Sequence, residues 1–313
     1  MEHLFQVAFP GLGIGEFTLN KIAFSLFGLE VRWYGVIITL GIICAYLYAS
    51  WRGKGEGISS DDLLDIAMFV VLFGIVGARL YYVLMRPGDY TTLMEIINIR
   101  KGGLAIYGGV IVGAITLAIA GRIKKIYMLR LLDCVAPGVM LAQAIGRWGN
   151  FFNGEAFGAQ TEIFCRMGLK LSDWSKMYYF HPTFLYESLW NLLGFALINL
   201  IYRKKKFDGQ IALMYFTWYG FGRMFIEGLR TDSLYIGSFR VSQLVAAVSF
   251  VLCGVLLIVG FSFARRRRLA DGDYNVVYGR LTGEKAEKTE EANNEINSEN
   301  IEGNEGTDNG KTD

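Results

Sequence analysis

The feature that most constrains the fold of this chain is a series of long runs without charged side chains. Residues 33–51, 102–121 and 241–264 form uninterrupted runs of 19, 20 and 24 uncharged residues. A helix of about 20 mostly apolar residues is long enough to cross a bilayer. Charged residues make up only 19% of the 313-residue chain, against roughly 25% in soluble proteins. The pattern predicts a membrane protein rather than two soluble domains.

Seven segments have the length and composition of a membrane span. They are residues 33–51, 66–85, 102–121, 131–149, 182–202, 210–228 and 241–264. The fourth is the weakest, because Asp133, Pro137 and Arg147 lie inside it. We therefore predict an all-α polytopic integral membrane protein with about seven transmembrane helices.

Basic residues are concentrated in alternate connections between these spans. The segments that follow spans one, three, five and seven carry 14 Lys and Arg residues. Connections rich in Lys and Arg stay in the cytoplasm. The rule predicts an N-terminus outside and a C-terminus inside, which requires an odd number of spans. The polar segment at residues 149–181 would then form a small exterior cap between spans four and five.

Charge also divides the chain lengthwise. Residues 269–313 hold 12 acidic and 4 basic residues, whereas the rest of the chain has a formal charge of about +10. Almost no large apolar residues follow Leu281, as is typical of disordered chains. We predict a membrane-embedded domain at 1–268 and a disordered cytoplasmic tail at 269–313.

Metal-binding spacing is missing from the sequence. The four cysteines lie far apart, and the chain has only two histidines. Zinc sites need closely spaced Cys and His ligands. We therefore expect no metal and no cofactor.

Polar side chains in the predicted spans gather at the ends that the charge rule places outside. Charged groups deep in a membrane cost about 2.5–3.5 kcal/mol each, so they mark candidate functional sites. The residues concerned are Tyr34, Arg79, Arg147, His181, Glu187, Arg223 and Glu227, together with the glycine-rich segment 102–109. Their common level predicts a site near the outer leaflet.

The densest polar stretch is GRWGNFFNGEAFG at residues 146–158. Arg147, Asn150, Asn153 and Glu155 follow one another at spacings of three, three and two. Asparagine amides both donate and accept hydrogen bonds, and glycines such as Gly158 allow close backbone approach. The combination suits a phosphate or glycerol headgroup. The alternative is a glycine-rich turn with Arg147 reaching the interface.

Arg223 and Glu227 lie four residues apart on one helix face, with Arg230 a further turn on. An arginine fork can hold phosphate oxygens bidentately, although the pair could also simply neutralise two buried charges. Arg79 could likewise have no role in binding and simply extend its charged group to the membrane interface. The glycine pairs on either side of Tyr107 could serve close helix packing.

Sequence signals of common hydrolases are missing, including GxSxG, HExxH and a Walker loop. An enzyme of this kind would use water or take its nucleophile from a second substrate.

Residues 146–158 resemble the signature of the bacterial prolipoprotein diacylglyceryl transferases. Further motifs resemble that family in chain order: RWYG at 32–35, GAR at 77–79, GGLAIYGG at 102–109, HPTFLYE at 181–187, Arg223 to Arg230 followed by Thr231-Asp232, and Ser242-Gln243. The resemblance covers roughly residues 10 to 265 and leaves out the acidic tail.

The resemblance implies transfer of the diacylglyceryl group of phosphatidylglycerol to the lipobox cysteine of a prolipoprotein signal peptide. A thioether forms and glycerol 1-phosphate leaves, which is the first step of lipoprotein maturation. The enzyme would lie in the bacterial cell membrane with its active site toward the outer leaflet. Its expected partners are these substrates and membrane lipids, and no nucleic acid.

The resemblance also implies roles for individual residues. Arg147 and Arg223 would hold the phosphate, and Asn150, Asn153 and Glu155 would position glycerol and phosphate oxygens. Candidates for thiol activation or its hydrogen-bond shell are Tyr34, Tyr107, His181 and Glu227. Further substrate-binding candidates are Arg79, Gly158, Tyr186, Glu187 and Arg230.

One position departs from the family pattern. Many members carry a histidine between the glycine pairs of the third span, where this chain has Tyr107. The phenol of an unperturbed tyrosine has a pKa of about 10, so it is a poor base at neutral pH. The identity of the base therefore stays open.

Two other functions are possible on the sequence. A carrier of anionic lipid would place its polar residues near the membrane midplane, unlike this chain. A water-using phospholipase would be expected to carry a serine or metal signature.

Overall fold

The computed structural model describes residues 3–271, except residues 87, 89, 91, 100, 101, 232–234 and 238. It consists of two compact units, Met1–Gly260 and Phe261–Asp313. Of the second unit, the structure describes only the end of the last helix. The predicted tail lies outside the described residues from position 272 onward, and residues 269–271 are helical.

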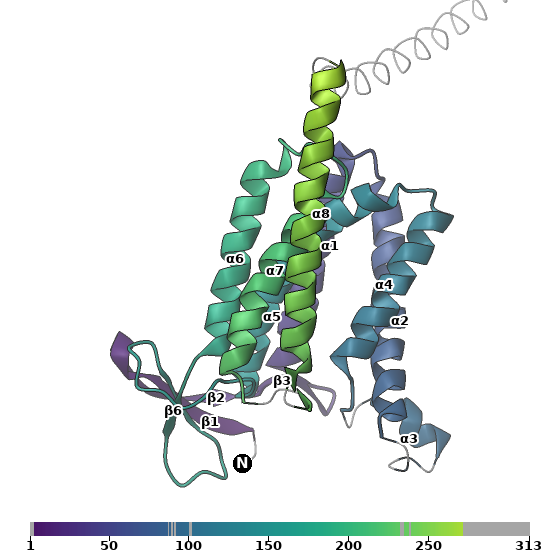
Figure 1. The fold of residues 1–313 in the computed structure, drawn as a ribbon. Helices are drawn as coiled ribbons and strands as arrows, with labels where there is room; N and C mark the ends of the chain where they lie inside the picture. Colours follow the sequence, from purple (N-terminus) through teal and green to yellow (C-terminus); the bar gives the residue numbers. More distant parts are fainter. Residues whose placement is uncertain are drawn as a thin grey trace, which may run out of the picture. The chain divides into compact units, whose positions relative to one another are not determined.

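Seven long helices correspond one by one to the seven predicted spans in the described part of the chain (Figure 1). They are α1 (Trp33–Gly55), α2 (Ser60–Leu84), α4 (Ile106–Ile123), α5 (Met128–Asn153), α6 (Thr183–Tyr202), α7 (Gln210–Leu229) and α8 (Val241–Asp271), with a short α3 at Leu93–Ile97. Six are long and apolar enough to cross a membrane, α8 over Val241–Arg266. Helix α7 is not among them, because Gln210, Arg223 and Glu227 lower its hydropathy. The prediction of a helical, multi-pass membrane protein is confirmed, and the seventh span stays a prediction.

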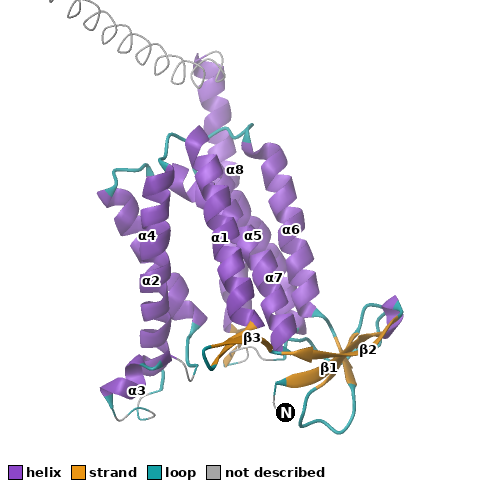
Figure 2. Cartoon of the chain, turned by 180° about the vertical axis from the view of Figure 1, so that it is seen from behind, coloured by secondary structure: helices purple, strands orange, loops and turns teal. Residues whose placement is uncertain are grey.

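The segment between α5 and α6 forms part of a four-stranded antiparallel sheet, so the chain is not entirely helical (Figure 2). The strands are β1 (Leu4–Phe9), β2 (Ile14–Asn20), β5 (Met167–Lys170) and β6 (Tyr178–Phe180), in the order β2-β1-β5-β6. Two hairpins accompany it, β3 (Ile22–Leu26) with β4 (Leu29–Arg32) and β7 (Tyr235–Ile236) with β8 (Phe239–Arg240). The segment between spans four and five forms a cap as expected, and its exterior position stays a prediction. The N-terminal half of the cap was not predicted, because β1 pairs with a strand distant in sequence.

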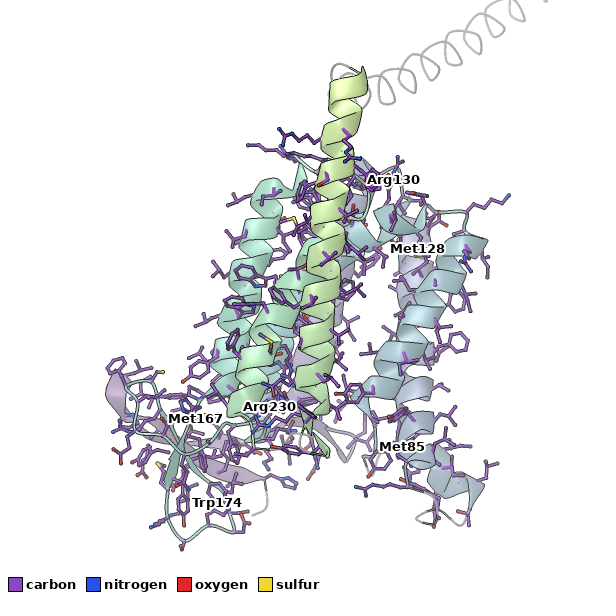
Figure 3. All side chains as sticks on the ribbon, viewed as in Figure 1. Met85, Met128, Arg130, Met167, Trp174 and Arg230 are labelled. Atoms are coloured by element: carbon purple, nitrogen blue, oxygen red, sulfur yellow. The ribbon has the colours of Figure 1, made fainter. Side chains whose placement is uncertain are left out.

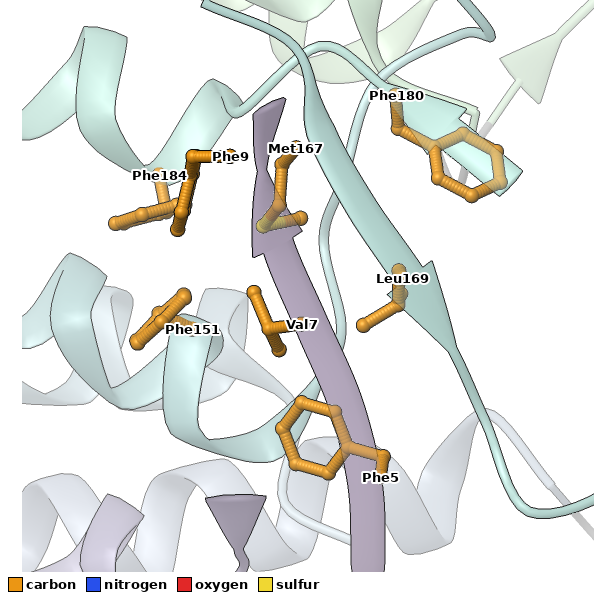
Figure 4. Packing of buried hydrophobic residues seen from close by; sticks show 8 residues of the cluster. All are labelled: Phe5, Val7, Phe9, Phe151, Met167, Leu169, Phe180 and Phe184. Atoms are coloured by element: carbon orange, nitrogen blue, oxygen red, sulfur yellow. The ribbon is translucent and has the colours of Figure 1, made fainter. Parts of the chain in front are cut away.

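An apolar core fixes this cap sheet to the ends of α5 and α6 (Figure 4). Val7 and Leu169 on neighbouring strands are fully buried in it, beside Phe151 of α5 and Phe184 of α6. The two phenylalanine rings stack with their centroids 4.8 Å apart. The core thus holds in place the end of α5 and the start of α6, where most predicted site residues lie.

Tryptophans clamp α6 to α7. Each indole N–H, of Trp190 and of Trp218, donates to the other residue's main-chain carbonyl at 3.0 Å. Their rings stack with centroids 4.2 Å apart. Reciprocal bonds satisfy both donors within the protein, so the pairing fixes the relative register of the two helices.

The charge that weakened the fourth predicted span has a structural explanation. Asp133 is fully buried, and its carboxylate accepts the main-chain N–H groups of Gly209 at 2.8 Å and Ala212 at 3.0 Å. Lys205 lies 3.2 Å from the same carboxylate. A negative charge there stabilises the N-terminus of α7. This cluster is at the end of the helices remote from the cap, the end where Arg130 lies in Figure 3.

Close packing of glycines joins α2 to α4. A Cβ atom on Gly108 would lie 2.3 Å from the carbonyl oxygen of Gly77 and 2.4 Å from the Cβ of Tyr81. Backbones can approach this closely only where side chains are absent. The glycines that follow Tyr107 therefore serve close helix packing, which was the second role considered for them from the sequence.

Replacing Gly108 with alanine should lower the melting temperature of the purified protein, because overpacking costs about 1–3 kcal/mol. Gly113→Ala on the same helix is the matched control, since its new Cβ would find its nearest neighbour, Val70, at 3.7 Å. Thermal unfolding of both variants in detergent checks the prediction. Equal melting temperatures for Gly108→Ala and the parent would contradict the close contact.

Candidate active site

A single buried carboxylate joins three helices near the cap. Glu187 of α6 is 2% exposed, and its two oxygens accept hydrogen bonds from two arginines. Arg147 of α5 reaches Oε1 at 2.5 Å, and Arg223 of α7 reaches Oε2 at 2.7 Å. A buried carboxylate needs such partners, because an unpaired charge in the interior is strongly destabilising.

Further contacts extend this arrangement from the interior toward the surface. Arg223 pairs with Glu227 at 2.5 Å, and Arg147 donates to Asn150 at 3.4 Å. The amide of Asn150 in turn donates to the exposed Glu155 at 3.1 Å. We call the resulting set the arginine network; its members are Arg147, Asn150, Glu155, Glu187, Arg223 and Glu227. All six are predicted site residues, so the structure brings together the centre of the predicted site.

A tight turn at the end of α5 makes the Asn150–Glu155 contact possible. Helix α5 ends at Asn153, and Gly154 has a left-handed φ of 64°. The main-chain N–H of Glu155 then donates to the carbonyl of Asn150 at 3.1 Å. Glycine favours this conformation, which closes many helices. The turn carries the chain back over the last turn of α5.

Gly158 lies where the cap meets α6 and α7. Its N–H donates to the carbonyl of His181 at 2.9 Å, and its backbone forms an isolated bridge with Arg230. A Cβ atom there would lie 2.7 Å from that of His181 and 3.0 Å from the carbonyl oxygen of Leu229. The position needs glycine for packing, and it fixes the start of α6 against the end of α7.

Other predicted residues lie at the start of α6 and the neighbouring ends of α1 and α5. The hydroxyl of Tyr186 is 3.3 Å from His181 Nδ1 and 3.4 Å from the sulfur of Cys165. The ring of Tyr34 lies against α5, where a Cβ on Gly149 would be 3.0 Å from it. Asn153 is the last residue of α5.

Two predicted residues have different surroundings. Arg79 is 8% exposed and makes five hydrogen bonds of 2.7–3.2 Å to main-chain carbonyls between α2 and α4. The carbonyls belong to Glu95, Ile96, Asn98, Gly102 and Gly103. The hydroxyl of Tyr107 is 2.7 Å from that of Ser242 at the start of α8. The contacts of Arg79 organise the loop, and those of Tyr107 connect α4 to α8.

Sequence reasoning missed several supporting residues. Arg240 donates to the main-chain carbonyl of Glu227 and, at 2.8 Å, to the hydroxyl of Tyr235. Gln243 donates to the carbonyl of Met224 at 2.9 Å. The guanidinium of Arg147 also interacts with the hydroxyl of Tyr219. Two of them had a sequence signal: Gln243 belongs to the motif Ser242-Gln243, and Tyr219 precedes Arg223 by one helical turn.

The arrangement is suited to binding an anion. Two guanidinium groups are held by Glu187, one of them also by Glu227, and the amide of Asn150 and the carboxylate of Glu155 lie toward the surface. Among the residues that the structure describes, no group of three or more His, Cys, Asp or Glu side chains could hold a metal ion.

Comparisons with known proteins identify the family. The family model described as prolipoprotein diacylglyceryl transferase matches residues 21–259. A phosphatidylglycerol–prolipoprotein diacylglyceryl transferase of Finegoldia magna is 47% identical over 241 residues, covering 76% of this chain and 94% of the relative. Proteins of the same name from Clostridium kluyveri and Listeria innocua are 44% and 43% identical, covering 75% and 79% of this chain and 94% and 92% of their own lengths. The chain therefore belongs to the prolipoprotein diacylglyceryl transferase family.

Proposed function

We propose that this protein transfers the diacylglyceryl group of phosphatidylglycerol to the lipobox cysteine of prolipoprotein signal peptides. The thiol sulfur of the signal peptide attacks the glyceryl carbon that bears the phosphate. A C–S bond forms, the C–O bond breaks, and glycerol 1-phosphate leaves with the electron pair while the thiol gives up its proton. The observation that carries the proposal is the pair of arginines held by Glu187.

The two arginines suit the leaving group. Glu187 takes one N–H from each guanidinium, so each keeps further donors for phosphate oxygens. Charge-assisted, forked hydrogen bonds to a phosphate are strong and geometrically specific. Groups positioned before the reaction stabilise the charge that develops on the departing phosphate. Asn150 and Glu155, nearer the surface, would position the glycerol headgroup.

Activation of the lipobox thiol does not require a strong base on the enzyme. A free thiol has a pKa of about 8.5, and nearby cations lower that value. The arginine network would supply most of this effect, and Tyr34, His181 and Tyr186 would shape its surroundings. We assign Arg79 to holding the loop before α4, and Gly158 and Arg230 to fixing the walls of the site.

The charge rule supports an orientation in a bacterial cell membrane. Basic connections lie at the helix ends remote from the arginine network, which supports an orientation with the network and cap toward the outer leaflet. Both proposed substrates are accessible there. The helical domain at 1–268 would carry the activity without the acidic tail at 269–313.

A carrier of anionic lipid is the alternative function. It would need a polar path reachable from both sides of the membrane. The relatives are named as transferases, and the arginine network lies near one end of the helices. The transferase is therefore the better-supported function.

One assay separates the two functions. Purified protein is mixed with phosphatidylglycerol vesicles and a lipobox peptide, and the peptide mass is measured. The transferase proposal requires a mass gain of one diacylglyceryl group on the cysteine. An unmodified peptide, together with lipid exchange between vesicles, would favour the carrier.

Replacing Arg147 with lysine should reduce transfer severely while membrane insertion stays normal. Lysine keeps the positive charge but cannot form the two-pronged contact with phosphate. Arg130→Lys makes the same change at the opposite helix end and should leave transfer unchanged. Near-normal transfer in Arg147→Lys would remove this residue from the phosphate site.

Tyr107→Phe should reduce transfer only moderately, by about 3–10-fold, the effect of one hydrogen bond. Ser242→Ala removes the partner of the same bond, so it should cause a similar loss, and the double variant little more. Tyr107→His should be tolerated, because imidazole can fill the same hydrogen-bonding place. Transfer rates of the four variants against pH test this. A wholly inactive Tyr107→Phe that still binds phosphatidylglycerol would indicate a side-chain base here.

A further inference from the structure

A second layer of polar side chains lies one helical turn deeper than the arginine network. On each of three helices, a polar residue lies four positions away from a member of the arginine network. The residues are Gln143 before Arg147, Asn191 after Glu187, and Tyr219 before Arg223. Residues four apart lie on the same helix face. Because α6 runs opposite to α5 and α7, all three positions lie on the side away from the cap.

Contacts between the helices place these side chains in one interior region. The hydroxyl of Ser188 donates to the carbonyl of Ala144 at 2.9 Å, and a Cβ on Gly194 would lie 3.0 Å from Met140. Asn191 lies between these two contacts with α5, opposite the stretch that carries Gln143. The side chain of Gln143 also interacts with the buried Tyr215.

Two amides in this region have polar atoms without protein partners. Asn191 is fully buried, and neither its Nδ2 nor its Oδ1 has a hydrogen-bond partner. The buried Oε1 of Gln143 also has none. Leaving one such group unpaired costs about 1–3 kcal/mol. Buried polar groups in this situation are typically satisfied by ordered water.

We propose that Asn191 and Gln143 bind ordered water beneath the arginine network, and that this hydrated site holds Glu187 between its two arginines. A buried water makes about three hydrogen bonds. The unpartnered atoms offer one donor group, Asn191 Nδ2, and two acceptors, Asn191 Oδ1 and Gln143 Oε1. A water that accepts from Asn191 Nδ2 and donates to Gln143 Oε1 keeps one proton to donate to the carboxylate of Glu187, which lies four residues before Asn191 on the same face of α6.

Asn191 is then a positioning residue that acts through Glu187. It contacts neither substrate, but its loss would let the carboxylate shift and would spoil the spacing of Arg147 and Arg223. This inference rests on the proposed phosphate site. Its experiment therefore measures phosphatidylglycerol binding separately from stability.

The test is Asn191→Leu, which keeps the branched four-atom shape of the side chain and removes both polar atoms. The matched control is Asn199→Leu on the same helix, whose amide accepts from Tyr48 at 2.8 Å and donates to the carbonyl of Phe195 at 2.7 Å. Both should lower the melting temperature. Asn191→Leu alone should raise the dissociation constant for phosphatidylglycerol, by about tenfold. Asn191→Ser leaves a hydroxyl and room for water, so it should recover most of the affinity.

A double-variant cycle with Arg147→Lys separates positioning from a purely structural role. If Asn191 acts through the arginine network, Asn191→Leu should change the affinity of Arg147→Lys by less than about twofold. If the dissociation constant of the double variant rises by the product of the two single-variant increases, the proposal is overturned. A higher melting temperature for Asn191→Leu with unchanged affinity would also overturn it, because an amide without water is better replaced by leucine.

The experiment distinguishes an incorrect phosphate site from an incorrect role for Asn191. If Arg147→Lys binds phosphatidylglycerol like the parent, the phosphate assignment is wrong and this inference falls with it. If Arg147→Lys binds weakly but Asn191→Leu binds normally, only the inference is wrong. A structure at a resolution that shows water should contain density between Asn191 and Gln143.

Discussion

The cap end of the helices depends on the ion pairs between one buried carboxylate and two arginines. Four charges lie together here, since Glu227 also pairs with Arg223, and they are tolerable only as a set, because removing one partner of a buried ion pair costs about 3–5 kcal/mol. Glu187 therefore fixes Arg147 and Arg223 at the spacing of its own two oxygens. Each residue comes from a different helix, so the same bonds stabilise the bundle and shape the proposed phosphate site.

The rest of the fold keeps these three helices in register. Trp190 and Trp218 clamp α6 to α7 just below the arginine network, and Asp133 holds the start of α7 at the far end. The cap sheet packs on Phe151 and Phe184, next to the turn that returns Glu155 to Asn150. A membrane protein with few interior charges can in this way position a polar site at a helix end.

The sequence predicted the helices well and the cap poorly. Uncharged runs locate membrane helices because a segment inside the bilayer must be apolar and must satisfy its own backbone hydrogen bonds. The pairing of β1 with β5 joins segments far apart in the sequence and leaves no local pattern. The arginine network was predicted in composition but not in connectivity, since spacing alone does not reveal that Glu187 bridges two helices. Arg79 shows most clearly what sequence position alone cannot predict. It lies at the same end of its span as the other candidate residues, but its five hydrogen bonds go to main-chain carbonyls of the loop before α4.

The central claim is that the Glu187 carboxylate sets both arginines for phosphate before the substrate arrives. Glu187→Gln keeps the shape but removes the charge that offsets two guanidinium groups. The most direct measurement is the rate of diacylglyceryl transfer to a lipobox peptide by this variant, followed by mass spectrometry, with correct membrane insertion verified. The account predicts a loss of about 100-fold or more, comparable to removing a preorganised electrostatic contact in other active sites. Transfer near the parent rate would contradict it.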